Sequence, residues 1–244
     1  MVFIITFFIL HWYSSAFIQS FFQHRYMAHK MFTMSKFWEK FFYLLTVLFQ
    51  GSSFLHPKSY AILHHEHHTH SDTEHDPHSP HVFKDIFSLM WNTKRIYTEI
   101  QQGSFKNETA FAKRLMAWPT VDNIAHGFGL RFLFAISYVA FYIKFAPNYW
   151  WFLLLPIHFL MGPIHGAFIN WCGHKYGYKN FDNGDQSKNT FFWDLFFMGE
   201  CFQNNHHRYP CRANFAVKWY EFDILYPIII SFSKLRIIRL VHGT

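Results

Sequence analysis

Residues 2–29 read VFIITFFILHWYSSAFIQSFFQHRYMAH, an apolar run that ends in two histidines. Positions 2–23 carry no charged side chain apart from a protonatable His11, and a helix of about 20 apolar residues is long enough to cross a bilayer. A secretory signal peptide is the alternative, because residues 14–16 (Ser-Ser-Ala) are small. No Lys or Arg precedes the run, as a signal peptide would require, so we expect a spanning helix.

A second apolar region extends to residue 171 and contains a turn signal, Pro147-Asn148, which is followed by three aromatic residues. Tyr and Trp favour the membrane interface, so the turn is expected at that depth. The region is therefore predicted to be a helical hairpin with spans at about 126–146 and 149–171. Another apolar run, 41–49, is too short to span and is predicted to be an interfacial or buried amphipathic helix.

The basic residues fall in two polar segments, one on either side of this hairpin. Of the 22 Lys and Arg residues, eleven lie between Arg25 and Arg114 and nine lie from Lys175 onward. By the positive-inside rule, segments 24–125 and 172–244 are cytoplasmic and the N-terminus is outside. One spanning helix before the first segment and two between the segments satisfy this arrangement.

The composition agrees with a membrane location. Aromatic residues make up 23% of the chain, which suits a lipid-facing surface with interfacial Trp and Tyr. The net charge of +7 alone would fit nucleic acid, anionic lipid or an acidic substrate, but beside long apolar runs it favours membrane lipids and not nucleic acid. The three cysteines form no CxxC pair, which argues against a disulfide scaffold, a zinc ribbon and an iron–sulfur cluster. We expect one domain, 1–244, of the all-α class: an integral membrane helical protein with a cytoplasmic histidine-rich helical cap.

Eight of the 19 histidines form a pattern of four motifs, HxxxxH, HxxHH, NxxxH and QxxHH. Their residues are His24 and His29; His64, His67 and His68; Asn170 and His174; and Gln203, His206 and His207. In HxxHH the histidines at i, i+3 and i+4 share one helix face, within reach of a shared metal centre, whereas the i, i+5 spacing suits a helix end. Imidazole binds iron, copper, nickel and zinc, and eight imidazoles are enough for two metal ions but too many for one tetrahedral zinc.

We do not expect the other histidines to bind metal. Isolated ones such as His11, His126, His158 and His165 are more typical of packing or interfacial residues than of ligands. The remaining histidines between residues 65 and 81 fit a solvated histidine-rich loop.

The four motifs together resemble the membrane fatty acid desaturase family, and within it the acyl-CoA (stearoyl-type, Δ9-like) desaturases. That family carries HxxxxH, HxxHH and HxxHH boxes in this order and an NxxxH after its last spanning helix. Asp76-Pro77-His78 after the second box and Gly199-Glu200 before the third box also match. Residues 204–210, with Asn-Asn-His-His and a later Pro, are similar to bacterial members. The resemblance covers nearly the whole chain, from residue 1 to about 225.

The resemblance implies an enzyme with two non-haem iron ions and dioxygen as co-substrate, which removes two hydrogens from adjacent methylenes and leaves a cis double bond in an acyl chain. The implied iron ligands are His24, His29, His64, His67, His68, His174, His206 and His207. Asn170 would hold a water on one iron. Ligating imidazoles usually donate their second N–H to a carboxylate or carbonyl, and the implied partners are Glu66, Asp72, Asp76 and Glu200.

The resemblance also implies partners and a location. The acyl substrate would be linked to CoA, to a carrier protein or to a lipid. Electrons would come from an external donor, either a ferredoxin or cytochrome b5 with its reductase. We expect a bacterial inner membrane protein whose active site faces the cytoplasm.

The sequence departs from the family pattern at two places. Gln203 stands where the Δ9-type family has the first histidine of its third box. An amide oxygen is a harder ligand than imidazole, so we expect the iron nearest Gln203 to be held more weakly without loss of activity. The family also has two helices before the first box where this chain has one, so either the first helix is absent or the start codon is misplaced.

Three alternatives differ in chemistry from a desaturase. Membrane di-iron hydroxylases share the histidine plan and insert oxygen instead of removing two hydrogens; the box order and the NxxxH favour desaturation. A metal transporter would place its ligands inside the spanning helices, whereas these clusters lie at or beyond helix ends. A non-catalytic zinc-binding membrane protein is the third alternative, and it would contain zinc and no iron.

Overall fold

The structure is a computed structural model, and it describes residues 1–105 and 110–241. The first seven helical elements are α1 (Val2–Ile18), the π-helix η1 (Gln19–Ala28), α2 (Lys36–Gln50), the 3-10 helix η2 (Gly51–Ser53), α3 (Pro57–His70), α4 (Ile86–Gln101) and α5 (Ala110–Arg114). The next are α6 (Pro119–His126), α7 (Phe128–Phe145), the 3-10 helix η3 (Tyr149–Leu154), α8 (Leu155–Phe159), α9 (Met161–Lys175), α10 (Gln203–Arg208) and α11 (Leu225–Lys234).

Short strands add little to this helical architecture. Strand β1 (Phe32–Met34) pairs antiparallel with β4 (Ile238–Leu240), and β2 (Trp193–Asp194) pairs parallel with β3 (Phe222–Asp223). The all-α class expected from the sequence is confirmed, and so is its membrane-like helical character.

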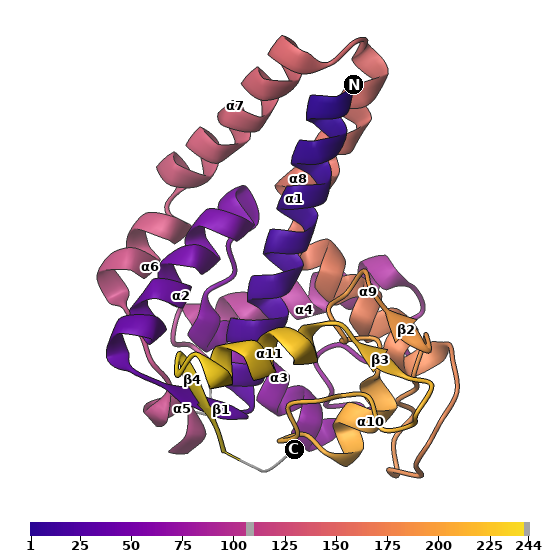
Figure 1. The fold of residues 1–244 in the computed structure, drawn as a ribbon. Coiled ribbons are helices and arrows are strands. Elements are labelled where there is room, and N and C mark those ends of the chain that lie inside the picture. Colours follow the sequence, from indigo (N-terminus) through magenta and orange to yellow (C-terminus); the bar gives the residue numbers. More distant parts are fainter. Residues whose placement is uncertain (106–109, 242–244) are drawn as a thin grey trace.

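Three helices project away from the rest of the molecule. Figure 1 shows α1, α7 and α8 extending together beyond the remaining helices, with the N-terminus at the far end of α1. Two continuous helical segments in the described part of the chain are long and apolar enough to cross a membrane, Val2–Ala28 and Phe128–Phe145. Val2–Ala28 includes the first span that we expected, 2–23, and Phe128–Phe145 lies within the second, about 126–146.

The region of the third expected span, 149–171, is bent. The helical stretch Tyr149–Phe159, which comprises η3 and α8, meets α9 at an angle of 71°, and only together are the two long and apolar enough to cross a membrane. The break follows from Pro163, because a proline ring clashes with the carbonyl four residues earlier, and that residue is Phe159, where α8 ends. The backbone N–H of Gly162 at the break donates to the Ser53 hydroxyl over 3.3 Å. The bend brings α9 under the projecting helices and into the histidine-rich part of the molecule.

Helix α2 covers the expected amphipathic segment 41–49 and extends beyond it at both ends. Its exposed face consists of apolar residues at i, i+4, i+7 and i+11, namely Phe37, Phe41, Leu44 and Leu48. Its buried face includes polar side chains, and the Gln50 amide donates to the Gln23 side-chain oxygen over 2.6 Å. An apolar face turned outward and a polar face turned inward suit contact with lipid.

The segment Val2–Ala28 changes its winding where the first histidine motif begins. Residues 2–18 are α-helical, whereas Gln19–Ala28 are π-helical. The backbone N–H of His29 donates to the carbonyl of His24 over 3.1 Å, which is an i→i+5 bond. In such a helix, residues five apart lie nearly above one another along the axis. The π-winding thereby places the two histidines of HxxxxH in one row.

The same helix is held to the C-terminal part of the chain by a buried ion pair. Arg25 is fully buried, and its guanidinium lies 2.9 Å from an Asp223 carboxylate oxygen and 3.9 Å above the Phe215 ring. Gly199 leaves room for this pair, because a Cβ there would lie 2.7 Å from the guanidinium and closer still to Asp223. Removal of one partner of such a pair leaves an uncompensated charge in the interior. The pair therefore fixes η1 against the C-terminal segment that follows the QxxHH motif.

Candidate metal centre

Helix α3 carries the HxxHH motif into the centre of the histidine-rich region. It begins at Pro57, a residue that favours the first position of a helix. His64 and His68 are one turn apart, and their rings lie 4.6 Å from one another between centroids. His67 diverges from both, with ring centroids 6.0 Å from His64 and 5.6 Å from His68. The histidines of this motif therefore belong to two neighbouring groups, His64 and His68 to one and His67 to the other. Their shared helix face did not predict this division.

The first group contains five histidines whose ring nitrogens converge: His24, His29, His64, His68 and His206. Distances between their Nε2 atoms are 2.7 Å for His29 and His64, 2.9 Å for His24 and His64, and 2.9 Å for His68 and His206. Nitrogens bound at right angles to one metal ion at about 2.1 Å are about 3.0 Å apart, so this spacing fits a shared ion.

Protonated rings would repel one another in this group. Burial lowers the pKa of four of its members well below the usual value for histidine, and the charges of neighbouring histidines lower it further; these members are His29, His64, His68 and His206. Neutral imidazoles offer lone pairs, and a metal cation placed among them would satisfy all five.

The second group consists of His67, His174 and His207. Their ring centroids are 4.8 to 5.1 Å apart. All three Nε2 atoms are buried and without a hydrogen-bond partner among the residues that the structure describes. Three buried nitrogens without partners, directed at a common centre, are costly by themselves and fit a second metal ion.

Carboxylates orient every ring of the second group through its Nδ1 atom. The distances are 2.9 Å from His67 to Asp76, 2.9 Å from His174 to Asp72 and 2.7 Å from His207 to Asp185. Burial alone would raise the pKa of these three carboxyls, but the hydrogen bonds and charges of the paired histidines outweigh it and hold each pKa below its usual range. An Nδ1–H that donates to a carboxylate leaves the Nε2 lone pair free for a metal.

Two of the expected carboxylate partners, Asp72 and Asp76, therefore lie against the second group, and a third lies against the first. A Glu200 oxygen is 2.5 Å from Nδ1 of His24, and the other oxygen accepts from the Ser20 hydroxyl. Glu66 lies elsewhere, with His70 at 3.9 Å. Asp185 was not expected, because it lies in a loop 22 positions before His207 and no spacing rule connects the two.

Gln203 and Asn170 lie beside the second group. Gln203 is on α10, one turn before His207, and packs so closely on the residue before His174 that a Cβ at Gly173 would lie 2.4 Å from its Cγ. The Gln203 side-chain nitrogen donates to the carbonyl of Glu200 over 2.8 Å. Gln203 and Asn170 both line a cavity that also reaches His64 of the first group.

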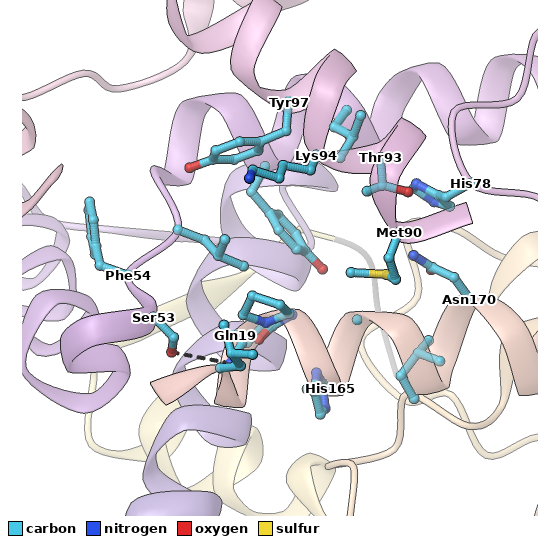
Figure 2. Close-up of a pocket in the computed structure, with 18 of the residues that line it drawn as sticks. Gln19, Ser53, Phe54, His78, Met90, Thr93, Lys94, Tyr97, His165 and Asn170 are labelled. Carbon is cyan, nitrogen blue, oxygen red and sulfur yellow. Dashed lines mark hydrogen bonds between the residues drawn. The ribbon is translucent and has the colours of Figure 1, made fainter. Parts of the chain in front are cut away.

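This cavity has a volume of about 680 Å³, which falls in the range of ligand pockets. Residues of helices α3, α4 and α9 and of the segment 52–55 line it. Figure 2 shows the α4 residues Met90 and Lys94 on the same side of α9 as Asn170. The cavity therefore meets the first histidine group at His64 and is bounded by apolar and polar side chains.

Two of the isolated histidines meet inside the projecting helices. His11 and His158 are buried, and their Nδ1 atoms are 2.7 Å apart. His158 Nε2 is also 2.9 Å from the Tyr142 hydroxyl. These contacts join α1, α7 and α8, so both residues have a packing environment, as the sequence suggested for isolated histidines. His165 instead lines the cavity.

Comparisons with known proteins agree with this geometry. The family model described as fatty acid desaturase matches residues 1–242. The sn-1 stearoyl-lipid 9-desaturase of Anabaena variabilis is 26% identical over 82% of this chain and 70% of its own length. The Delta-9 desaturase-like 5 protein of Arabidopsis thaliana is 26% identical over 87% and 68%. The hex-5-enoyl-[acyl-carrier protein] acetylenase of Moorena producens is 25% identical over 88% and 69%.

Desaturases are oxidoreductases that use oxygen and non-haem iron, and the two histidine groups described above are suited to hold metal. The family match and the apolar helices support the expectation that this chain is a membrane-associated enzyme of lipid metabolism. The chain belongs to the fatty acid desaturase family.

Proposed function

We propose that the eight histidines hold two iron ions, five around one and three around the other, and that the chain introduces a cis double bond into a long acyl chain bound in the cavity. The observation that carries this proposal is the convergence of eight ring nitrogens in two groups, one of which reaches a cavity of suitable volume through His64. Gln203 and Asn170 lie beside the three-histidine group, where an amide oxygen or a water could complete the set of ligands around the second iron.

Bound iron would supply the activation of dioxygen that breaks two C–H bonds on adjacent methylenes. The overall reaction removes two hydrogen atoms from the acyl chain, takes up two electrons and two protons, and reduces one dioxygen to two waters. The electrons come from an external donor, a ferredoxin or cytochrome b5 with its reductase. The carboxylates of Asp72, Asp76, Asp185 and Glu200 hold the imidazoles in the tautomer and orientation that leave Nε2 available.

The cavity walls offer apolar side chains to the acyl chain. Helix α4 contributes Phe87, Met90 and Trp91, and α9 contributes Pro163 and Ile169. An apolar chain in this space keeps its methylenes in one position relative to His64 and Asn170. The acyl head group, whether CoA, carrier protein or lipid, would remain outside the cavity.

The lipid profile of an expressing host tests this function. Fatty acid methyl esters, separated by gas chromatography with mass detection, should contain a new cis-unsaturated product with the wild-type chain. His64→Ala should abolish it, whereas His65→Ala is the matched control, because His65 stacks on Phe111 and lies outside both groups. Hydroxylated products without new double bonds would identify a hydroxylase, and zinc without iron in the purified protein would identify a non-catalytic metal protein.

We also propose that the chain lies in a bacterial inner membrane with its histidine groups facing the cytoplasm. The concentration of Lys and Arg in segments 24–125 and 172–244 supports this orientation. Cys211 is exposed and Cys201 is buried. A membrane-impermeant maleimide should therefore label Cys211 in inverted vesicles and not in intact spheroplasts. Labelling of Cys211 in spheroplasts would contradict the orientation, and Cys201 serves as the unreactive control.

A further inference from the structure

An exposed aromatic surface lies outside the metal centre and the cavity, and two segments of the chain contribute to it. Its exposed members are Phe191, Phe192, Trp193, Phe196, Trp219 and Phe222. In the pairing of β2 with β3, Trp193 lies opposite Phe222, and Trp193 Nε1 donates to the Tyr220 carbonyl over 2.9 Å. Trp193 is 67% exposed and Trp219 is 94% exposed. A continuous apolar surface of this kind marks a site of contact with lipid or with another protein.

The first of these segments, 189–199, exposes no charge. Its one charged residue is Asp194, which is fully buried and accepts from the backbone N–H groups of Phe197 over 2.9 Å and Cys201 over 2.8 Å. The Phe192 carbonyl accepts from the backbone N–H of Phe222 over 3.0 Å. Backbone polar groups that enter lipid must find their partners within the protein. These internal bonds therefore suit a non-helical segment that meets lipid.

The segment lies alongside the first spanning helix. The Trp12 indole of α1 donates to the Phe196 carbonyl over 3.0 Å, and the Ser20 hydroxyl of η1 donates to the Met198 carbonyl over 3.2 Å. The segment thus reaches α1 within the part of Val2–Ala28 that precedes the buried first histidine motif.

The second spanning helix gives a similar level. The ring of His11, which adjoins Trp12 in the sequence, lies 5.0 Å from the ring of Tyr138. Tyr138 lies about 15 Å along α7 from Phe128, where that helix begins. A bilayer that covers α1 and α7 therefore also surrounds the tip of the segment 189–199.

Contacts on the inner side of the segment leave its outer side free. The Phe197 ring stacks on Phe168 of α9 with 4.2 Å between centroids and lies 5.9 Å from the Trp12 ring. Figure 1 shows β2 and β3 next to α9. Phe196, the next residue toward the N-terminus, is 60% exposed. Protein therefore covers one side of the segment, and the aromatic side chains on the other side extend the apolar surface of the spanning helices.

We propose that the aromatic surface inserts into the lipid bilayer beside α1, in the half of the membrane nearer the histidine groups. Lipid is the occupant because the surface adjoins a spanning helix at that depth, and because Trp and Tyr favour the membrane interface. The segment connects His174 of α9 to His206 of α10, so its contact with lipid also holds the connection between the two histidine groups. The inference depends on the membrane position of α1 and α7 and not on the reaction that the chain performs.

Nitroxide labels on introduced cysteines of the full-length protein, reconstituted in vesicles of phosphatidylcholine and phosphatidylglycerol, test the proposal. Phe196→Cys reports on the aromatic surface, and its backbone bond to Trp12 survives the substitution. Leu133→Cys on the exposed face of α7 is the lipid control, and Glu74→Cys, in an exposed loop, is the water control. Cys211 is the exposed native cysteine, so all three variants also carry Cys211→Ser.

Electron paramagnetic resonance measures how often each label collides with oxygen, which concentrates in lipid, and with a water-soluble nickel complex. The ratio of oxygen to nickel collisions at Phe196→Cys should match that at Leu133→Cys and exceed that at Glu74→Cys. A ratio equal to that at Glu74→Cys overturns the inference. A label that neither reagent reaches also overturns it, and means that a second copy or another protein covers the surface.

Leu195→Cys provides the same measurement where Phe196→Cys fails to fold, because Leu195 is also exposed. The collision ratio does not depend on activity. A lipid-like ratio in a protein that makes no unsaturated product would contradict the proposed function and leave this inference standing.

Discussion

Asp185→Asn should weaken metal binding in the three-histidine group and leave the five-histidine group unchanged. Asp185 accepts from His207 Nδ1 over 2.7 Å, and its carboxylate also receives the backbone N–H of Ser187 over 2.9 Å. Asn preserves the size and one acceptor but removes the charge. A hydrogen bond to a charged group is worth about 1.5–3 kcal/mol, which corresponds to about 10- to 100-fold in metal affinity.

Chelator competition followed by iron analysis measures this effect. One iron per protein should leave the Asp185→Asn variant at a chelator concentration about 10- to 100-fold lower than in wild type, and the second iron should leave at the wild-type concentration. Asp182→Asn is the control, because Asp182 is exposed in the same loop and its carboxylate accepts from the Gly184 backbone N–H over 3.3 Å. Release of both irons at wild-type concentrations would refute the role given to Asp185.

Three further predictions concern other parts of the molecule. Gln203→His should strengthen iron retention in the three-histidine group about tenfold or more under the same chelator series, whereas an unchanged iron content and rate in Gln203→Ala would make Gln203 a bystander. Arg25→Met should lower the free energy of unfolding by about 3–5 kcal/mol because the Asp223 carboxylate is left buried without its ion-pair partner. Thermal unfolding in detergent measures this loss of stability. The double variant Arg25→Met/Asp223→Leu should recover the lost stability. His158→Leu should cost about 1–3 kcal/mol in the same assay by leaving His11 and the Tyr142 hydroxyl without their partner, and an unchanged unfolding temperature would contradict the importance of that contact.

Much of the site could be predicted from the sequence because its side chains occur in local motifs. The spacing of His64 and His68 requires only a helix, and a helix places them together. His67 shows the limit of this reasoning. It shares a face with them on a helical wheel, yet it joins His174 and His207, which are more than a hundred residues away. Only the tertiary packing of α9 and α10 against α3 decides this division.

The remaining features depend on long-range contacts or on local geometry that composition does not encode. Asp185 meets His207 through the path of a loop, so no helical period connects them. The π-winding of η1 aligns His24 and His29, although the HxxxxH spacing had suggested a helix end. Pro163 did signal a break within the region 149–171, but the 71° bend also depends on the contact of Gly162 with Ser53. Buried polar atoms without a hydrogen-bond partner, such as Gln19 Oε1, can be identified only when the positions of all neighbouring residues are known.

Anomalous diffraction at the iron edge from crystals of the purified protein tests the central claim most directly. The account predicts two peaks, one surrounded by the Nε2 atoms of the five-histidine group and one by His67, His174 and His207. A single peak, or iron bound away from these two groups, would contradict it.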